Sequence, residues 1–469
     1  MKFYITTAID YTNAKPHMGH VFEKILTDVI ARYHRGIGDD VFFLTGSDEN
    51  GLKNQTSAEE NGVTPQKWVD EKVKDFLIMK EKFNLSYDNF IRTSDPRHHK
   101  LVKEIWQKCL EKGDIYKKSY QGLYCVGCEG FVKDSDLVDG KCPNHDKKPE
   151  VVEEKNYFFK LSNYKEKIKE LLEKEELKIY PKHRTKEIIN ILNELEDFSI
   201  SRPREKLSWG VSVPGDEDQT MYVWFDALSN YLTGVDFDLN SEKFKKYWPA
   251  DVHVIGKDII RFHAIYWPAM LLSFGIDLPK SILVHGFVNV GGKKMSKSIG
   301  NVIDPEEALG RHGVDPLRYF LIREIPTTDD GDFSFERFDE RYESDLANSL
   351  GNLVSRVTNI AEKNGIEFRI MNQESRIDLE EYFREYKLDR ALEAIWEKVY
   401  EANKYVDETK PWSIKDDPEK LDLIINNLLN SIKNIAEALT PFMPETAKKI
   451  LKIFESEKIV KSEPLFPKM

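Results

Sequence analysis

Cysteine is scarce in this sequence, with four residues in a chain of 469. So few cysteines over this length exclude a disulfide scaffold. Long apolar runs are absent too, since no stretch reaches the about 18 apolar residues of a membrane span. Met1 and Lys2 lead directly into the first apolar run and leave no room for a signal peptide. We therefore expect a cytoplasmic protein that crosses no membrane.

An excess of positive charge is also lacking, because the formal net charge is -12. This balance argues against a protein that coats nucleic acid indiscriminately, although local basic patches can still contact phosphates. Hydrophobic residues make up 40% of the chain and charged residues 32%, which is typical of a soluble globular protein. The length predicts about two or three domains, and the sequence holds no internal repeat or low-complexity tract.

The N-terminal segment predicts a β-α-β unit. Phe3 to Ile9 is an apolar, β-branched run typical of a strand, and a second such run begins at Val41. Between them, apolar residues recur with helical spacing from Val21 to Tyr33, and Gly36 marks the end of the helix. Such units form parallel sheets that bind ligands at the carboxyl ends of their strands. Further strand candidates are residues 221–224, 252–256, 282–285 and 287–290.

We predict an α/β fold with a doubly wound, Rossmann-like parallel sheet and a zinc-binding connective insertion, followed by an all-α helical bundle. The first half of the sheet domain spans residues 1–115, the insertion 116–220, the second half 221–336 and the helical domain 337–469. Short loops rich in glycine, cysteine and aspartate from Gly122 to Asp146 indicate the insertion. Helical stripes of apolar residues beyond Glu336 indicate the bundle.

The run Pro16-His17-Met18-Gly19-His20 opens the first helix. His17 and His20 are three residues apart and share one face of the first turn, where backbone N–H groups favour anions. Both imidazoles can donate to phosphate oxygens there. Gly19 has no Cβ, so a flat ring can lie against the helix start. For this motif alone, two histidines that merely cap an ordinary helix remain the alternative.

The run Lys293-Lys294-Met295-Ser296-Lys297-Ser298 lies between Gly291-Gly292 and Gly300. Flanking glycines predict a mobile loop, and no acidic residue adjoins these lysines in the sequence. A mobile cationic loop suits negative charge that develops on a leaving group. A solvated basic loop is the alternative.

A third motif predicts a metal site. Cys125 and Cys128 form a Cys-x-x-Cys pair, and thirteen residues separate Cys128 from Cys142, which forms a Cys-x-x-His pair with His145. Ligand type and spacing are those of a structural Zn²⁺ site. Four protein ligands complete a tetrahedron and leave no position for a catalytic water, so we expect one structural ion.

The histidine and lysine motifs, in this order and setting, resemble the signature pair of the class I aminoacyl-tRNA synthetases. The resemblance narrows to the methionyl-tRNA synthetase family and covers nearly the whole chain. The residues that carry it are Tyr11, Asp48, the single zinc knuckle, Val223 to Ala227, Ile255 to Ile259, Phe262 with His263, and Asn352, Arg356 and Trp412.

The resemblance implies four groups of functional residues. The catalytic group is His17, His20, Lys294 and Lys297. The ATP-binding group is Gly19, His20, Glu23, Gly256, Asp258, Val288 and Lys297. The methionine-binding group is Ile9, Tyr11, Asp48, Trp224, Ala227, Leu228, Tyr231, Ile259 and His263. The anticodon-binding group is Asn352, Arg356 and Trp412. By pattern alone, the apolar members are core residues near strand ends and Trp412 is a helix-end packing residue.

The implied activity is ATP-dependent attachment of methionine to its tRNA through a methionyl-adenylate, with Mg²⁺ accompanying ATP. The helical domain would then bind the anticodon. Some relatives carry an appended C-terminal domain for RNA binding and dimerisation, whereas this chain ends soon after the bundle, so we expect a monomer.

Other functions stay open on the sequence alone. Synthetases for isoleucine, valine and leucine usually hold a large editing domain between the two motifs, and the stretch here is too short for one. A cysteine enzyme would place zinc at the substrate. A non-enzymatic zinc-knuckle tRNA-binding protein would not need the histidine and lysine motifs, and a simpler nucleotidyltransferase would not need the helical domain.

Overall fold

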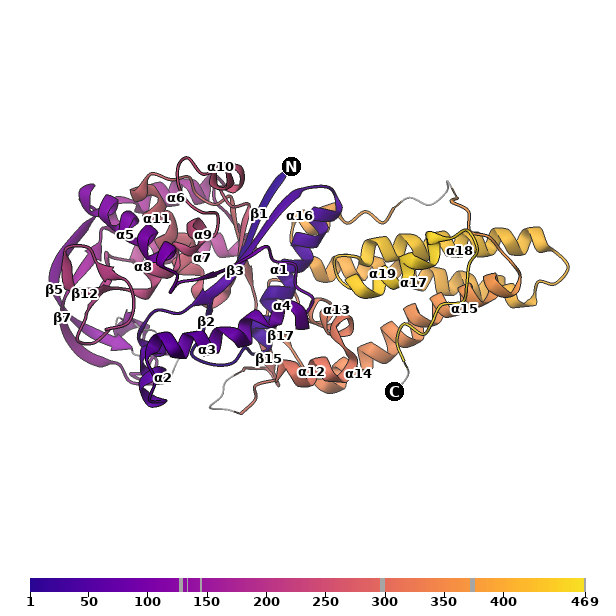
Figure 1. Ribbon diagram of the computed structural model, residues 1–469, viewed down its shortest axis with the longest axis horizontal. Helices are drawn as coiled ribbons and strands as arrows, with labels where there is room; N and C mark the ends of the chain where they lie inside the picture. The colour runs from indigo at the N-terminus through magenta and orange to yellow at the C-terminus, as the bar shows by residue number, and fades with distance from the viewer. Residues whose placement is uncertain (126–129, 133, 144–145, 296–299, 372–375, 468–469) are drawn as a thin grey trace.

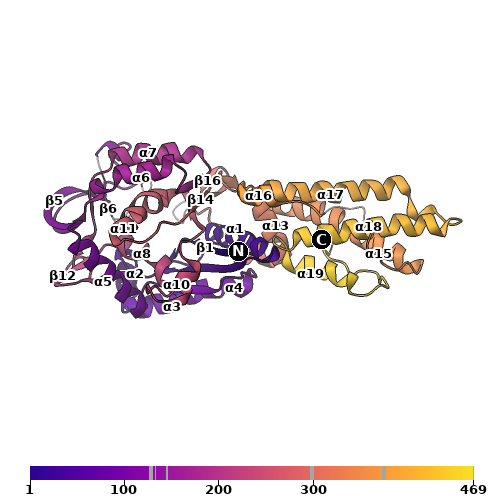
Figure 2. The same cartoon turned by 90° about the horizontal axis from the view of Figure 1, so that it is seen from above.

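The computed structural model describes residues 1–125, 130–132, 134–143, 146–295, 300–371 and 376–467. The molecule is elongated, with an α/β part at one end and a helical part at the other (Figure 1). The same division appears from above (Figure 2). Within the described residues, no helix combines the length and apolar character that a bilayer crossing requires.

A seven-stranded sheet forms the centre of the α/β part, in the order β2-β3-β1-β13-β14-β8 with β4 beside β3. Every pair in it is parallel, which confirms the predicted parallel sheet. The strands are β1 Lys2–Thr7, β2 Asp10–Tyr11, β3 Asp40–Asp48, β4 Asn89–Arg92, β8 Lys178–Tyr180, β13 Val252–Gly256 and β14 Ser281–His285. Ile5 of β1 pairs with Val252 of β13, so distant segments of the chain meet at the middle of the sheet.

Both faces of this sheet are buried. Ile5 and Phe43 belong to one apolar cluster, whereas their neighbours Tyr4 and Leu44 belong to a second. This alternation is the two-residue period of a strand with helices on each side. Helix α1, Met18–Gly36, covers the first face through a stripe that includes Phe22.

Other helices surround the sheet and its loops. They are α2 Leu52–Glu60, α3 Pro65–Leu77, α4 Met79–Lys82, α5 Pro96–Glu111, α6 Lys165–Glu173, α7 His183–Glu194, α8 Val223–Ala227, α9 Asn230–Thr233, α10 Glu242–Tyr247 and α11 Trp267–Phe274. Asp95 accepts from the backbone N–H of Arg97 ahead of α5, and Pro96 occupies its first turn, as expected at a helix start.

Two antiparallel sheets lie at the end of the molecule away from the helical part (Figure 1). One has the order β6-β5-β7-β9 and the other β10-β12-β11. Their strands are β5 Ile115–Cys125, β6 Gly130–Val132, β7 Glu150–Phe159, β9 Phe198–Ser199, β10 Ser201–Pro203, β11 Ser212–Val213 and β12 Asp216–Met221. These strands fall within the range 116–220 or at its edge.

Two strand predictions need correction. Residues 221–224 do not form a strand, since β12 ends at Met221 and α8 begins at Val223. A short apolar run cannot be assigned to strand or helix from periodicity alone. Residues 287–290 do form a strand, β15 Val288–Val290, but it pairs with β16 Lys293–Lys294 and β17 Gly331–Asp332 outside the central sheet. The sequence also failed to predict β4 and β8.

The C-terminal region is helical, which confirms the predicted bundle. After α12 Pro305–His312 and α13 Val314–Glu324 come α14 Phe335–Arg341, η5 Tyr342–Gly351, α15 Asn352–Lys363, α16 Glu380–Arg384, α17 Leu388–Thr409, the turn η6 Pro411–Ser413, α18 Pro418–Leu439 and α19 Pro444–Lys452. Buried residues such as Leu392, Trp396 and Leu428 join one apolar cluster with the face of the sheet that α1 covers.

Candidate active site

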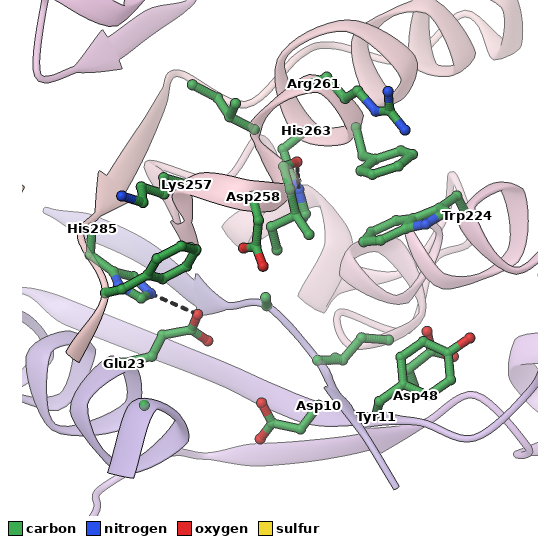
Figure 3. Close-up of a pocket in the computed structure, with 18 of the residues that line it drawn as sticks. Asp10, Tyr11, Glu23, Asp48, Trp224, Lys257, Asp258, Arg261, His263 and His285 are labelled. Carbon is green, nitrogen blue, oxygen red and sulfur yellow. Dashed lines mark hydrogen bonds and ion pairs between the residues drawn. The ribbon is translucent and has the colours of Figure 1, made fainter. Parts of the chain in front are cut away.

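A cavity of about 640 Å³ opens at the carboxyl ends of β1, β3, β13 and β14. Every described residue that the sequence placed in the catalytic, ATP and methionine groups lines it. These residues are Ile9, Tyr11, His17, Gly19, His20, Glu23, Asp48, Trp224, Ala227, Leu228, Tyr231, Gly256, Asp258, Ile259, His263, Val288 and Lys294. The remaining member, Lys297, lies outside the described residues. Side chains from both halves of the sheet face the same space (Figure 3).

His17 and His20 cap α1 and remain donors. Nδ1 of His17 accepts from the backbone N–H of Gly19 at 3.1 Å, and Nδ1 of His20 accepts from the backbone N–H of His17 at 3.0 Å. An imidazole nitrogen that accepts carries no hydrogen, so the proton of each neutral ring sits on Nε2. The rings stack with centroids 3.8 Å apart. Capping and phosphate donation are therefore compatible, because they use opposite nitrogens.

Gly19 is required by this cap. A Cβ on Gly19 would lie 2.9 Å from Cε1 of His17, closer than real contacts allow. The flat ring that rests against the helix start is therefore the imidazole of His17 itself. Burial, reinforced by the nearby Lys24, lowers the pKa of His20 to about 3. His20 is thus neutral near pH 7.

A row of buried charges lies beneath the histidines. Nζ of Lys24 lies 2.8 Å from Oδ2 of Asp10 and 3.3 Å from Oε1 of Glu23, and all three side chains are almost fully buried. Burial raises the pKa of Asp10 to about 6, against the opposing effect of Lys24. The pKa of Lys24 is raised, because its two carboxylate partners outweigh the effect of burial.

Lys294 has an acidic partner that sequence proximity did not reveal. Its Nζ lies 3.4 Å from Oδ2 of Asp258 and 4.0 Å from the ring centroid of Phe287. Asp258 follows β13 directly in the turn η3, Lys257–Ile259. No acidic residue is adjacent to the loop lysines in the sequence, but the fold brings Asp258 close to Lys294. At 60% exposure, the Lys294 side chain still reaches solvent.

Aromatic rings form the opposite side of the cavity. Trp224 stacks on Phe262 with centroids 3.8 Å apart and planes 4° from parallel. The ring of Tyr11 depends on Gly51, whose φ is +98° and where a Cβ would lie 2.6 Å from the tyrosine oxygen. Tyr11 pairs with Asp48 between β2 and β3, which brings a hydroxyl and a carboxylate to the same edge of the cavity (Figure 3).

Tyr231 and His263 form a hydrogen bond that fixes the histidine tautomer. Nδ1 of His263 lies 3.1 Å from the carbonyl oxygen of Ile259, which can only accept, so that nitrogen carries the hydrogen. Nε2 of His263 then accepts from the hydroxyl of Tyr231 at 2.7 Å. Burial lowers the pKa of His263 to about 4, consistent with a neutral ring.

The predicted zinc ligands are described only in part. Cys125 closes β5 opposite Gly130, and Cys142 donates its N–H to the carbonyl of Lys147 while its own carbonyl accepts from Asp146. Both cysteine side chains are 2% exposed. Cys128 and His145 lie outside the described residues, and the described part of the chain contains no cluster of three potential metal ligands. Two buried thiols, one at the end of β5 and one in the turn that precedes Lys147, suit a structural Zn²⁺. In contrast, burial raises the pKa of Cys109 to about 12, as for a packing residue.

The three predicted anticodon residues lie in the helical part, away from the cavity. Asn352 begins α15 and is exposed, and Arg356 lies one turn later. The Arg356 guanidinium lies 5.2 Å from the ring centroid of Trp412, which is 53% exposed. The structure therefore brings Arg356 and Trp412 together across the bundle.

Sequence reasoning missed several residues that line the cavity. His285 and Phe287 lie at or just beyond the end of β14, Lys257 follows β13, and Phe262 had no assigned role. A signal for His285 existed, because it ends a predicted strand of a parallel sheet, where ligands bind. No local pattern indicated that Phe262 would stack on Trp224.

Two families match the chain. Residues 3–148 and 136–358 match the family of class I (M) tRNA synthetases, and residues 358–464 match the anticodon binding domain of methionyl tRNA ligase. The methionine–tRNA ligase of Caldanaerobacter subterraneus is 46% identical over 96% of this chain and 73% of the relative. That of Brucella suis is 42% identical over 96% of this chain and 91% of the relative.

A solved structure has the same fold. The methionyl-tRNA synthetase of Mycobacterium tuberculosis in complex with methionyl-adenylate superposes with a TM-score of 0.93 at 40% identity, covering the whole of both chains. Together with the sequence matches, this similarity shows that the chain belongs to the methionyl-tRNA synthetase family of class I aminoacyl-tRNA synthetases.

Proposed function

We propose that this chain attaches methionine to its tRNA in two steps, through a methionyl-adenylate formed from methionine and ATP. One observation carries the proposal: the described residues predicted for the phosphates, the nucleoside and the amino acid all line a single cavity. Phosphate-binding donors occupy one side of it and stacked aromatic rings the other. A nucleotide and an apolar amino acid could therefore meet within it.

In the first step, a carboxylate oxygen of methionine attacks the α-phosphorus of ATP, and the bond to the β-phosphate oxygen breaks to release pyrophosphate. No protein nucleophile is needed, so catalysis consists of positioning and charge stabilisation. The Nε2–H groups of His17 and His20 donate to oxygens of the reacting phosphate. Lys294 and Lys297 stabilise the β- and γ-phosphates as pyrophosphate leaves. Release of Lys294 from Asp258 would free it for this role.

Methionine is held by its two ends. Asp48, at the carboxyl end of β3, pairs with the ammonium group. The thioether lies against aromatic rings, including Trp224, because a polarisable sulfur favours such contacts. Ile9, Tyr11, Ala227, Leu228, Tyr231, Ile259 and His263 complete the pocket. Gly256 and Asp258 bind the ribose, and Glu23 and Val288 contribute to the adenosine site.

We infer two metal ions, one that binds with the substrate and one in the insertion. Mg²⁺ bound with ATP would neutralise phosphate charge. Cys125, Cys128, Cys142 and His145 would hold a Zn²⁺ that stabilises the fold of the insertion. Parts of that insertion, including Val132 and Leu137, line the cavity.

In the second step, a hydroxyl of the terminal tRNA ribose attacks the carbonyl carbon of the adenylate, and AMP leaves. Asn352, Arg356 and Trp412 bind anticodon bases, since unpaired bases are read by stacking and by hydrogen bonds to their edges. The described residues assigned to ATP and methionine all come from one chain, which supports a monomer. We place the activity in the cytoplasm, where thiols stay reduced and available to zinc.

The amino-acid dependence of ATP–pyrophosphate exchange tests this function. We expect exchange with methionine, and little or none with leucine or cysteine at the same concentration. Exchange that required a different amino acid would overturn the specificity. Absence of exchange with every amino acid would overturn the activity and favour a binding protein.

A further inference from the structure

Glu23 and His285 form a buried ion pair at the floor of the cavity. Nε2 of His285 lies 3.0 Å from Oε2 of Glu23 (Figure 3). Glu23 lies on α1, one residue before Lys24, and His285 is the last residue of β14. The two residues are 262 positions apart in the sequence. The pair therefore joins the half of the site that carries the histidine motif to the half that carries the lysine motif.

Both nitrogens of His285 face acceptors. Nδ1 lies 2.7 Å from the carbonyl oxygen of Gly286, which cannot donate. Although burial raises it, the pKa of Glu23 remains below its ordinary value, because Lys24 and His285 stabilise the carboxylate. A carboxylate also cannot donate. Gly286 and Glu23 thus hold the ring of His285 from both of its nitrogens.

The surroundings hold this ring in one orientation. His285 is 5% exposed and Glu23 7%. The ring of Phe22 meets His285 edge-on, with centroids 5.5 Å apart. Gly256 lies alongside, where even an added Cβ would make only an ordinary van der Waals contact, 3.8 Å from Nε2 of His285.

The four side chains of this cluster are linked in a row by hydrogen bonds. Oε1 of Glu23 accepts from Lys24, Oε2 accepts from His285, and Lys24 also pairs with Asp10. When all four groups are ionised, Asp10, Lys24, Glu23 and His285 form a row of alternating sign. Because each carboxylate oxygen has two acceptor positions, Glu23 can be held from both sides and still accept a further hydrogen bond from the cavity.

We propose that His285 is a positioning residue for the nucleotide and acts through Glu23. By fixing Oε2, it directs the remaining acceptor positions of Glu23 towards the donors of a nucleoside, namely ribose hydroxyls or an adenine amino group. The proposal rests on the proposed ATP-dependent function. It also gives β14 a role in the site, because the chain continues from His285 through Phe287 to Lys294.

Two substitutions separate this role from packing. His285→Asn keeps a short donor for the Gly286 carbonyl and loses the contact with Glu23, whereas His285→Gln is long enough to retain a donor near Glu23. We expect His285→Asn to raise the KM for ATP in pyrophosphate exchange by about ten- to a hundredfold, the range of one hydrogen bond to a charged group. The KM for methionine should stay within about twofold, and His285→Gln should recover most of the ATP affinity.

A double-mutant cycle with Glu23→Gln tests whether His285 acts through Glu23. In that background, His285→Asn should change the KM for ATP by no more than about twofold. His312 offers a matched control, because its side chain is 3% exposed and pairs with a carboxylate, that of Asp339, at 2.7 Å. We expect His312→Gln to leave the KM for ATP unchanged.

Three results would overturn the proposal: an unchanged KM for ATP in His285→Asn, an equal rise in the KM of both substrates, or additive effects in the cycle. If His285→Asn does not fold, His285→Ala, which also removes the contact with Glu23, is carried through the same cycle, and additivity there is equally decisive. Exchange by the unsubstituted protein serves as the reference. Its absence would contradict the proposed function, whereas normal exchange with unaltered ATP dependence in the variants would contradict only this inference.

Discussion

Arg318 and Asp28 form an ion pair in which neither side chain is exposed, with Nη2 of Arg318 2.7 Å from Oδ2 of Asp28. The guanidinium also donates to the carbonyls of Phe83, Asn84, Pro441 and Phe442. Asp28 lies on α1 and Pro441 and Phe442 follow α18, so this pair connects the catalytic part to the helical part. An arginine with every N–H satisfied favours one arrangement of these elements.

Removing the charge of Asp28 should destabilise the protein strongly. Asp28→Asn leaves the buried guanidinium without a counterion, which costs about 3–5 kcal/mol in the free energy of unfolding. Urea unfolding measures this change. The exposed pair Lys398–Glu401 is a control, because Lys398→Ala should cost at most about 1 kcal/mol. Similar losses of unfolding free energy in the two variants would contradict the expectation that burial makes the Asp28–Arg318 pair more important.

Stability should fall as the pH is lowered from about 6.5 towards 4. His20 and His263 have pKa values of about 3 and about 4 in the folded chain, because burial disfavours their charged forms. The unfolded chain therefore binds more protons in this window, and unfolding becomes more favourable with acid. Asp10 opposes the trend, since burial raises its pKa to about 6 and the folded state then holds its proton. Because two histidines favour proton uptake by the unfolded chain and one carboxyl group favours uptake by the folded chain, the net effect of these three groups is a loss of stability in acid.

The variant His20→Asn isolates one part of this effect. Asparagine can still accept from the N–H of His17 but does not titrate. The slope of unfolding free energy against pH should fall by about 1.4 kcal/mol per unit between pH 4 and 6. Denaturant unfolding at a series of pH values gives the slope, and an unchanged slope would show that His20 does not titrate differently on folding.

Lys294→Ala should slow adenylate formation and leave methionine binding intact. The loss of one cation at a leaving phosphate reduces the exchange rate by about a hundredfold or more. Lys297→Ala should have an effect of the same kind. Lys293→Ala is the matched control, since Lys293 is the exposed neighbour of Lys294 on β16 and does not line the cavity. Equal losses of exchange rate in Lys293→Ala and Lys294→Ala would indicate that the net charge of the loop matters rather than the position of Lys294.

Trp412→Ala should spare pyrophosphate exchange and weaken tRNA charging. Stacking of one base on an aromatic ring contributes about 1–3 kcal/mol, so the KM for tRNA should rise about five- to a hundredfold. Tyr400 is equally exposed, at 53%, and Tyr400→Ala serves as the control. Parallel loss of exchange and charging in Trp412→Ala would contradict the separate roles of the two parts.

Zinc content tests the metal site directly. We expect one Zn²⁺ per chain by elemental analysis. We expect none in a variant that carries both Cys125→Ser and Cys142→Ser. Removal of zinc by a chelator should lower the melting temperature, because ligand geometry organises the insertion. Equal melting temperatures with and without metal would contradict a structural role.

The sequence predicted the site best where the chemistry is local. His17 and His20 follow a strand and begin a helix, so their setting could be inferred from neighbouring residues. The pairs Glu23–His285, Lys294–Asp258 and Trp224–Phe262 bring together segments far apart in the chain, and no periodicity reports such contacts.

Strand assignments failed for a related reason. Val223 and Trp224 suit a strand by composition, but tertiary packing places them on α8. The run at 287–290 is extended as predicted, yet its pairing with Gly331 and Asp332 depends on a distant segment. Extended conformation was predictable there, whereas membership of a particular sheet was not.

The pairing of β1 with β13 also limits how early the central sheet can form during translation. Ile5 cannot meet Val252 until about half of the protein has left the ribosome, and His285 emerges later still. At about 5–20 residues per second, the floor of the cavity is therefore incomplete for roughly a quarter of a minute to a minute. Contacts of such long sequence separation also slow folding itself. A nascent chain consequently acquires its nucleotide site late, and ATP cannot assist the earlier folding steps by binding there.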